Sequence, residues 1–336
     1  MPLRCILLPL VALLVGSAPA HARTLKLATL APEGSAWMQE MRAVAREIEA
    51  RTDGRVRLKF YPGGVMGNDK TVLRKVRAGQ LHGGAFTSGA LADVYPDLEL
   101  YGIPLLFRSR DEVDYVRTRM DAGMIAGLAE AGLATMAITE QGFAYLMSRK
   151  PAREVADLAG AKVWTQEGDS MSLAAFEIAG VSPVQLQLAD VYTALQTGLV
   201  DTVAAAPMGA IALQWHTRVR YVTDVPLSYL TGALVIDARV FGSLAAEDQR
   251  IVREVVREAS KRLDVETRRG DAGAREALEA EGIEFVSPTT PEEVERWHEV
   301  SRRTVERVRR EGDYSQAAID EIQRHLAEYR SGAARP

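Results

Sequence analysis

Along the stretch from Asp157 to Pro207, short apolar runs alternate with segments whose apolar residues have the spacing of an α-helix. Short apolar runs, AKVWT, PVQL and VDTVAAA, are typical of buried strands, and the residues between them have helical spacing. Strands and helices that alternate with short loops predict a parallel sheet covered on both faces. Ligands of such sheets bind beyond the carboxyl ends of the strands. We therefore expect a site near Trp164 and Ala205, which lie at two of these ends.

The same alternation of strand and helix patterns runs through residues 24–139 and predicts a first parallel sheet. Residues 141–150 are extended and are expected to carry the chain into a second lobe. Ala245–Glu281 has a long charged helical pattern that Gly270 and Gly273 weaken, so we expect a bend there. Two lobes are also expected from length, because one hydrophobic core rarely serves about 300 residues.

The first 22 residues have the pattern of a secretory signal peptide. Arg4 gives a positive start, ILLPLVALLVG is a short apolar run, and APAHA offers cleavage after Ala22 or, as the second choice, after Ala20. The alternative, a membrane anchor, is disfavoured because the apolar run is too short to cross a bilayer. Cys5 lies inside this segment, so the mature chain has no cysteine and no disulfide. The pattern predicts a periplasmic protein.

Charge and motif content argue against several function classes. Loss of Arg4 leaves 40 basic and 45 acidic residues, a net charge of −5, which disfavours a nucleic-acid or anionic-membrane surface. The chain has no G-x-S-x-G elbow, phosphate-binding loop or dinucleotide glycine motif. Histidines without metal-ligand spacing stand at His82, His216, His298 and His325. We therefore expect no enzyme activity, no cofactor and no metal.

Glu167 and Asp169 flank Gly168 and could be interpreted as an acid pair. The simpler interpretation is a solvated turn in which Asp169 caps the helix that follows. His216, beside Trp215, is likewise interpreted as a surface or helix-end histidine rather than a site residue.

The order of motifs along the mature chain resembles that of the DctP-type solute-binding subunits of TRAP transporters. The resemblance is carried by ARTDGRVRLKFYPGGVMGND, VRAGQLHGG, YGIPLLF, GFAYLMSRKP, DLAGAKVW and LADVYTALQTGLVDTV. It implies two α/β lobes, joined by crossing segments and a long hinge helix, that close on a ligand. It also implies docking onto a pair of membrane permease subunits that use an ion gradient.

These expectations combine into an α/β, two-lobed periplasmic binding protein fold with mixed or parallel sheets. The ligand cleft lies between the lobes. Lobe I is expected to contain residues 23–142 and about 231–275. Lobe II is expected to contain residues 143–230 and about 276–336.

The chain departs from the family pattern at positions that usually hold polar ligand-binding groups. The resemblance implies an arginine, able to grip a carboxylate bidentately, where this chain has Trp164. A second arginine is replaced by Ala144, and the asparagine that commonly follows the D-G motif is replaced within Asp201–Ala206. Lys162 lies on the same strand but deeper. Without a cation, a carboxylate would lose hydration at a cost of several kcal/mol on entering the cleft.

A tryptophan at this position instead offers roughly 150–250 Å² of apolar surface. We therefore predict a hydrophobic or amphipathic ligand. The predicted lining residues share large apolar side chains and are Trp37, Phe143, Tyr145, Trp164, Tyr192, Met208 and Trp215. Each aromatic could instead be plain core. The alternative ligand is a small organic acid held by a non-standard cation. The arginine-less pattern is similar to that of TRAP-related proteins that work with a tetratricopeptide-repeat partner, which makes such a partner a further expectation.

Overall fold

The structure is a computed structural model that describes residues 22–311 and 314–332. The predicted signal peptide, residues 1–22, lies outside the described residues except for Ala22. The strands are β1 (Arg23–Thr29), β2 (Val56–Tyr61), β3 (Gly83–Thr87), β4 (Leu133–Ser148), β5 (Trp164–Gln166), β6 (Val184–Leu186), β7 (Thr202–Ala205), β8 (Tyr221–Thr223), β9 (Ser228–Asp237) and β10 (Glu284–Val286).

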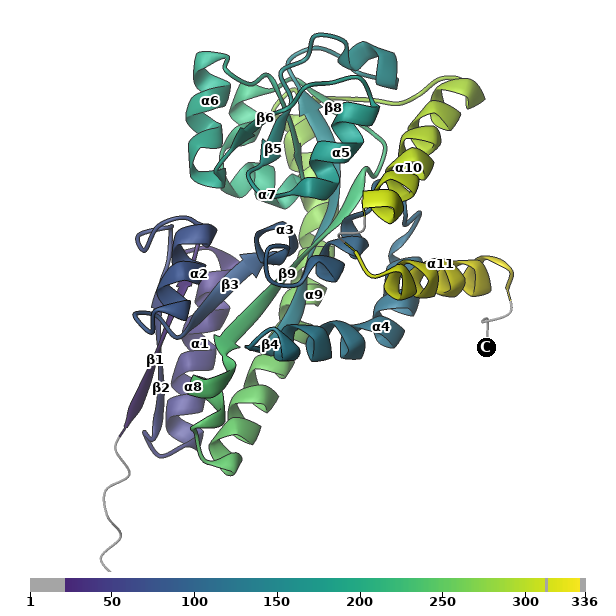
Figure 1. The fold of residues 1–336 in the computed structure, drawn as a ribbon. Helices are drawn as coiled ribbons and strands as arrows, with labels where there is room; N and C mark the ends of the chain where they lie inside the picture. The colour runs from purple at the N-terminus through teal and green to yellow at the C-terminus, as the bar shows by residue number, and fades with distance from the viewer. Residues whose placement is uncertain (1–21, 312–313, 333–336) are drawn as a thin grey trace, which may run out of the picture.

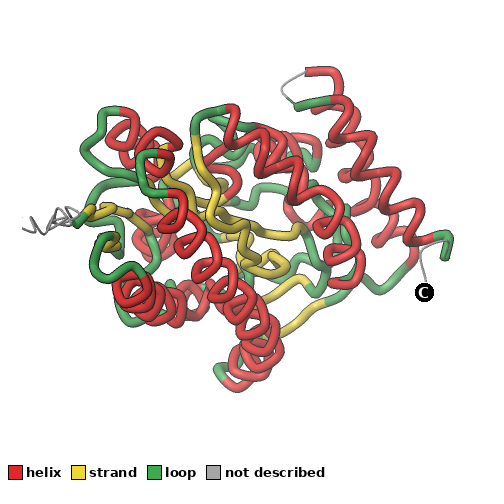
Figure 2. The backbone as a smooth tube through the Cα atoms, turned by 90° about the horizontal axis from the view of Figure 1, so that it is seen from below, coloured by secondary structure: helices red, strands yellow, loops and turns green. Residues whose placement is uncertain are grey.

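Helices cover the sheets on both sides, as Figure 2 shows. The α-helices are α1 (Ala36–Arg51), α2 (Asp69–Arg77), α3 (Ser88–Leu91), α4 (Arg110–Glu130), α5 (Ser170–Ile178), α6 (Val191–Thr197), α7 (Pro207–Ala212), α8 (Ala238–Gly242), α9 (Ala246–Ala280), α10 (Pro291–Glu311) and α11 (Gln316–Arg330). The short 3₁₀ helices are η1 (Pro96–Gly102), η2 (Val155–Leu158), η3 (Leu188–Asp190) and η4 (Trp215–Arg218). None of these helices is long and apolar enough to cross a membrane.

The main sheet is mixed, with the order β10-β8-β4-β9-β3-β1-β2, and β7 pairs with β4 outside this path. β1 is parallel to β2 and β3, whereas β9 is antiparallel to β3 and β4. β5 and β6 form a separate parallel pair, which an isolated parallel bridge between Val163 and Thr202 joins to the strand β7. The α/β class with mixed sheets is confirmed.

β4 connects the two lobes of the molecule. Its first part pairs with β9, and its last part pairs with β7 and β8. The register shifts between Glu140 and Gly142, where the strand passes from one lobe to the other. Gly142 has φ +94°, and a Cβ there would lie 2.5 Å from Oδ2 of Asp271 on α9. Only glycine allows the strand to bend here with α9 so close.

α9 is the second element shared by both lobes, and Figure 1 shows it running from the lower body to the upper one. It is one helix of 35 residues, about 52 Å at the standard rise. Its apolar face packs against α1 and β4 in lobe I and against α7 in lobe II. The helix is unbroken through Gly270 and Gly273, where the sequence predicts a bend.

The last two helices of the chain pack on different lobes. α10 packs against α5 of lobe II, whereas α11 packs against α4 and η1 of lobe I. Ile319 and Ile322 of α11 are fully buried in the same core cluster as Leu98 and Val116. We predicted residues 276–336 to belong to lobe II, but of the described residues among them α11 buries its apolar face on lobe I.

Candidate functional site

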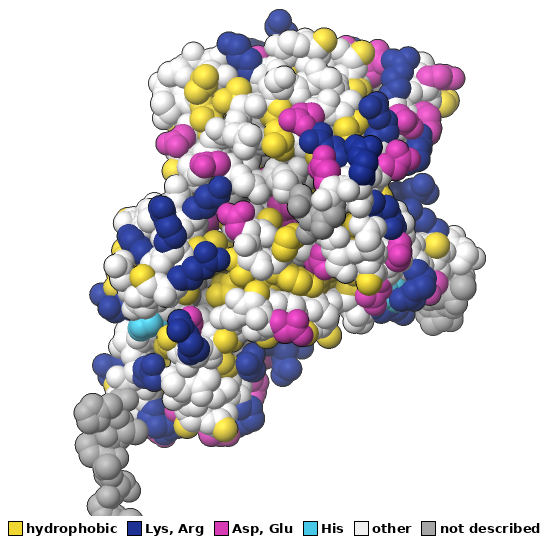
Figure 3. Space-filling view, viewed as in Figure 1, with side chains coloured by type: hydrophobic (Ala, Val, Ile, Leu, Met, Phe, Trp, Pro, Cys, Tyr) yellow, Lys and Arg dark blue, Asp and Glu magenta, His cyan; other side chains and the backbone are white. Residues whose placement is uncertain are grey.

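A cavity of about 710 Å³ lies between the lobes and is lined by residues from both of them. Lobe I contributes residues of β1, α1, β3 and α3, and lobe II contributes residues of β5, β7, α7 and η4. α9 and β4 complete the wall where they cross between the lobes. On the face shown in Figure 3, hydrophobic side chains gather across the middle of the molecule. The volume suits a small organic ligand.

Two tryptophans form the lobe II wall of this cavity. The rings of Trp164 and Trp215 meet edge to face, with centroids 5.2 Å apart and an interplanar angle of 76°. The indole N–H of Trp164 donates a hydrogen bond to the Leu186 carbonyl at 3.0 Å, so its one polar atom is satisfied inside the protein. The ring therefore presents apolar surface in a fixed orientation.

Trp37 and Met208 complete the part of the predicted set that the structure brings together. Trp37, in the first turn of α1, lines the cavity from lobe I and packs edge to face on Phe60. Met208 lines it from α7, and its thioether lies 3.2 Å from the point where a Cβ on Gly270 would be. The glycine that weakens α9 in sequence terms thus makes room for a cavity-lining side chain.

Phe143, Tyr145 and Tyr192 do not line the cavity, and the predicted set is corrected at these three positions. Successive side chains of a strand point to opposite faces, so Ala144, which lines the cavity, turns both of its neighbours away. Phe143 packs on the ring of Tyr229 in the lobe I core. The Tyr192 hydroxyl accepts a hydrogen bond from Arg218 at 2.8 Å.

Apart from Trp164, the positions at which this chain departs from the family pattern carry alanines in the cavity wall. Ala144, Ala205 and Ala206 all line the cavity. The neighbouring cations do not take over their role. The ammonium of Lys162 donates to the carbonyl of Gly198 at 3.0 Å, and Arg149 donates to the carbonyl of Leu195. Both therefore bind the C-terminal end of α6, where carbonyl groups lack helical partners.

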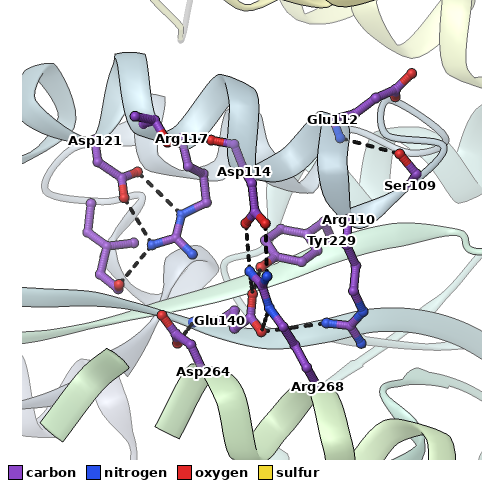
Figure 4. A network of polar contacts seen from close by, with 12 residues as sticks. Ser109, Arg110, Glu112, Asp114, Arg117, Asp121, Glu140, Tyr229, Asp264 and Arg268 are labelled. Carbon is purple, nitrogen blue, oxygen red and sulfur yellow. Dashed lines mark hydrogen bonds and ion pairs between the residues drawn. The ribbon is translucent and has the colours of Figure 1, made fainter. Parts of the chain in front are cut away.

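A network of charged groups joins α9 to β4 and α4 (Figure 4), and one of its members, Glu140, lines the cavity. The side chain of Glu140 is fully buried and accepts hydrogen bonds from Arg268 at 2.8 Å and from the Tyr229 hydroxyl at 2.5 Å. Arg110 lies 3.5 Å away, and Arg268 also pairs with Asp114 at 2.6 Å. The buried charge of Glu140 is thus matched by two guanidinium groups.

A second group of carboxyls lies where α2 meets the end of β5. Asp69 is buried, lines the cavity, and has one weak hydrogen bond among the described residues, from Nε2 of Gln166 at 3.5 Å. Burial raises the pKa of Asp69 to about 7. Gln166 of lobe II also donates to Oγ1 of Thr87 in lobe I at 3.2 Å, so it connects the two lobes.

Glu99 and Asp169 both lie close to Gly89 of α3. Glu99 is 3% exposed, its Oε2 accepts the Tyr314 hydroxyl at 2.5 Å, and its Oε1 has no partner among the described residues. A Cβ on Gly89 would lie 3.2 Å from that Oε1 and 3.6 Å from Cγ of Asp169. Burial, and then the charge of Asp169, raises the pKa of Glu99 to about 9.

Asp169 also caps α5, as the sequence predicts, and accepts the backbone N–H of Ser172 at 2.8 Å. Burial raises the pKa of Asp169 as well. Like Asp69, it lines the cavity. The ammonium of Lys70, the residue after Asp69, lies 3.9 Å from Glu167.

The remaining charged groups on the wall lie on α9. Glu266 and Arg269 line the cavity and are exposed, and Arg269 is the one basic residue of the wall that the structure describes. Among residues 22–311 and 314–332, no cluster of three or more possible metal ligands is found.

The sequence profile of the bacterial extracellular solute-binding proteins of family 7, the DctP family, matches residues 27–311. The chain belongs to this family. Its members are substrate-binding proteins of transport systems, not enzymes, and the resemblance seen in the sequence is confirmed.

Relatives of known name and structure agree with this assignment. The 2,3-diketo-L-gulonate-binding periplasmic protein YiaO of Escherichia coli is 28% identical over 221 residues. That alignment covers 63% of this chain and 65% of YiaO, less than two thirds of the relative.

Two solved structures show the same fold. The sugar acid binding protein DctPAm of Advenella mimigardefordensis, in complex with galactonate, has a TM-score of 0.84 at 16% identity over 91% of this chain and 98% of its own. A TRAP periplasmic solute-binding protein of Desulfovibrio salexigens, with bound orotic acid, has a TM-score of 0.83 at 19% identity over 91% and 99%. The two-lobed periplasmic binding protein fold is confirmed.

Proposed function

We propose that this protein is the extracytoplasmic solute-binding subunit of a TRAP-type secondary transporter. Residues 1–22 direct it to the periplasm, the cavity between the lobes captures a small molecule, and a membrane permease receives it. Ligand binding stabilises the closed arrangement of the lobes, which the permease recognises. The observation that carries this proposal is the cavity of about 710 Å³, lined by both lobes, in a chain of the DctP family. A tetratricopeptide-repeat partner remains part of the proposal.

The ligand is proposed to be amphipathic, with an apolar part held by the tryptophan wall. Trp164 stands where the resemblance implies a carboxylate-binding arginine, and its only polar atom bonds to the Leu186 carbonyl. Burying the apolar surface of a ligand against these rings favours binding by about 25 cal/mol per Å².

A small organic acid is the second candidate. The names of relatives favour it, since DctPAm is in complex with galactonate and YiaO is named for 2,3-diketo-L-gulonate. Among the described residues that line the cavity, Arg269 on α9 is the basic side chain that could bind such an acid.

Extraction of the purified protein tests the proposal. The protein is exported, purified without detergent and extracted with organic solvent, and the released compounds are identified by mass spectrometry. A stoichiometric amphipathic compound supports the apolar ligand. A stoichiometric small acid would overturn the ligand class and leave the transport role in place.

Trp164→Arg separates the two ligand classes further. If the cleft is apolar, this change abolishes binding of the native ligand and creates weak binding of sugar acids, because a guanidinium then faces the cavity. If an acid already binds at Arg269, Trp164→Arg leaves acid affinity nearly unchanged and Arg269→Gln removes it. Calorimetric titration with galactonate measures both variants.

A further inference from the structure

The charge of the cavity wall points to a ligand class that the apolar wall alone does not define. Acidic side chains of the wall are Asp69, Glu140, Asp169 and Glu266, and the basic one among the described residues is Arg269. Glu140 is matched by Arg268 and Arg110, and Glu266 lies on the same exposed helix surface as Arg269. Asp69 and Asp169 remain, and neither has an ion-pair partner among the residues that the structure describes.

These two carboxyls lie next to the tryptophan wall. Trp164 and Gln166 are two residues apart on β5, so their side chains share one face of the strand, about 7 Å from each other along it. Gln166 reaches Oδ2 of Asp69, and Asp169 begins α5 three residues later. An apolar wall therefore leads directly to an acidic end within one cavity.

The acidic end of the cavity is shielded from solvent. Asp69 is 5% exposed, and Oε1 of Glu99, buried and unpartnered, lies behind Asp169. Lys70 is the nearby cation, and it is half-exposed and lies 3.9 Å from Glu167. A buried carboxylate is costly unless a cation or several hydrogen bonds match it. In its charged form Asp69 has no cationic partner among the described residues, and a positively charged group of a ligand would supply one.

We propose that the cleft binds an organic cation, an amphipathic ammonium compound whose charged end lies between Asp69 and Asp169 and whose apolar body lies on Trp164 and Trp215. The inference rests on the proposed solute-binding function and names its ligand class. The rings bury the apolar body of such a ligand, and the carboxyls attract its charged end. A carboxylate ligand would meet like charges at this end of the cavity.

Three probes of one shape and different charge test this assignment: 2-phenylethylammonium, 2-phenylethanol and 3-phenylpropanoate. Each is titrated by calorimetry at pH 8 into protein freed of bound compounds by unfolding and refolding. We expect the ammonium to bind about tenfold or more tighter than the alcohol, and the carboxylate to bind most weakly. Tighter binding of the carboxylate would overturn the cation proposal while supporting solute binding as such.

Variants that remove one carboxyl charge at a time test which residues bind the ammonium group. Asp69→Asn and Asp169→Asn keep size, and asparagine keeps the cap of α5. Each is expected to weaken ammonium binding about tenfold and to leave the alcohol unchanged. Asp111→Asn, an exposed carboxyl away from the cavity, is the control and should change neither. Unchanged ammonium affinity in both cavity variants would contradict the proposal. Circular dichroism checks that each variant is folded.

The pH dependence gives an independent measurement. Protonation of Asp69 removes its charge, so ammonium affinity should fall as the pH is lowered below 7, while alcohol affinity stays constant. Lys70, Glu167, Asp169 and Glu99 are the charged or titratable groups near Asp69, and Asp69→Asn should remove most of the dependence.

If none of the three probes binds, the cation proposal is tested by identifying the compound extracted from the exported protein. A cation supports the proposal, and a neutral compound or an acid overturns it. No extracted compound together with no probe binding would overturn the proposed solute-binding function itself.

Discussion

Two regions of this molecule bury carboxyl groups, and they do so in opposite ways. At the hinge, Glu140 is fully buried but hydrogen-bonded by Arg268 and Tyr229, with Arg110 nearby. Beside the cavity, Asp69 has one weak hydrogen bond from a neutral amide and Glu99 has one from a tyrosine. In the first region two guanidinium groups lie within ion-pair distance of the buried carboxylate, whereas Asp69 and Glu99 have no ion-pair partner among the described residues.

This difference distinguishes a structural site from a ligand site. The hinge network connects β4, α4 and α9, and each of its charges serves to hold these elements together. Asp69 on the cavity wall and Glu99 behind it have no ion-pair partner among the described residues, and burial raises the pKa values of both. Unmatched buried acids at a cavity wall are typical of functional sites.

The largest effect is expected from breaking the hinge network. Arg268→Met leaves Glu140 with the Tyr229 hydroxyl and the more distant Arg110, and we expect the free energy of unfolding to fall by about 3–5 kcal/mol, because a buried charge loses its hydrogen-bonded guanidinium. Urea unfolding of the ligand-free protein measures this. Arg262→Met is the matched control on the same helix. The Arg262 side chain is exposed and its partner Glu40 is partly exposed, so a loss of less than about 1 kcal/mol is expected. Equal losses in the two variants would contradict the structural role of the network.

The second prediction concerns the pH dependence of stability. The folded-state pKa of Glu99 is raised from 4.5 to about 9, so between these values the folded protein keeps a proton that the unfolded chain has lost. Stability therefore falls as the pH rises through this window, by at most about 1.4 kcal/mol per pH unit. Asp69 acts in the same direction between pH 3.8 and about 7.

Glu99→Gln isolates this contribution. The difference in unfolding free energy between wild type and Glu99→Gln, measured from pH 5 to 9, should change steadily in favour of the variant as the pH rises. A constant difference would show that Glu99 titrates normally and that the cavity carboxyls are not under strain from burial.

The smallest effect is expected at Lys70. Its ammonium is half-exposed and lies 3.9 Å from Glu167, so Lys70→Met should change the free energy of unfolding by about 0.5 kcal/mol or less. A loss above about 1 kcal/mol in urea unfolding would mean that Lys70 neutralises the cavity carboxyls. In that case the contrast between the two regions would disappear.

Much of the fold could be predicted from local patterns. The helix over 36–51, the long helix over 246–280 and the strand at Trp164 all follow from periodicity, caps and glycine positions, which depend on residues near in sequence. The patterns placed Trp164 near the carboxyl end of a strand, whereas in the structure β5 begins at Trp164 and all three of its residues line the cavity.

The tertiary structure decided which side chains share the cavity. Strand alternation turns Phe143 and Tyr145 away because Ala144 faces inward, and the sequence alone does not say which of the two faces is buried against lobe I. Asp69 escaped prediction because it follows the helix cap Asn68 in a loop-like stretch, and only the approach of Gln166 from the other lobe shows it to be buried.

Local chemistry along the chain thus determined the elements, the family and the apolar character of the position at Trp164. The pairing of β4 with both lobes and the packing of α11 on lobe I depend on contacts between residues far apart in the chain. The same holds for the presence of Asp69 and Asp169 in one cavity wall. Such contacts are set by which apolar faces bury each other, and only the folded structure establishes that choice.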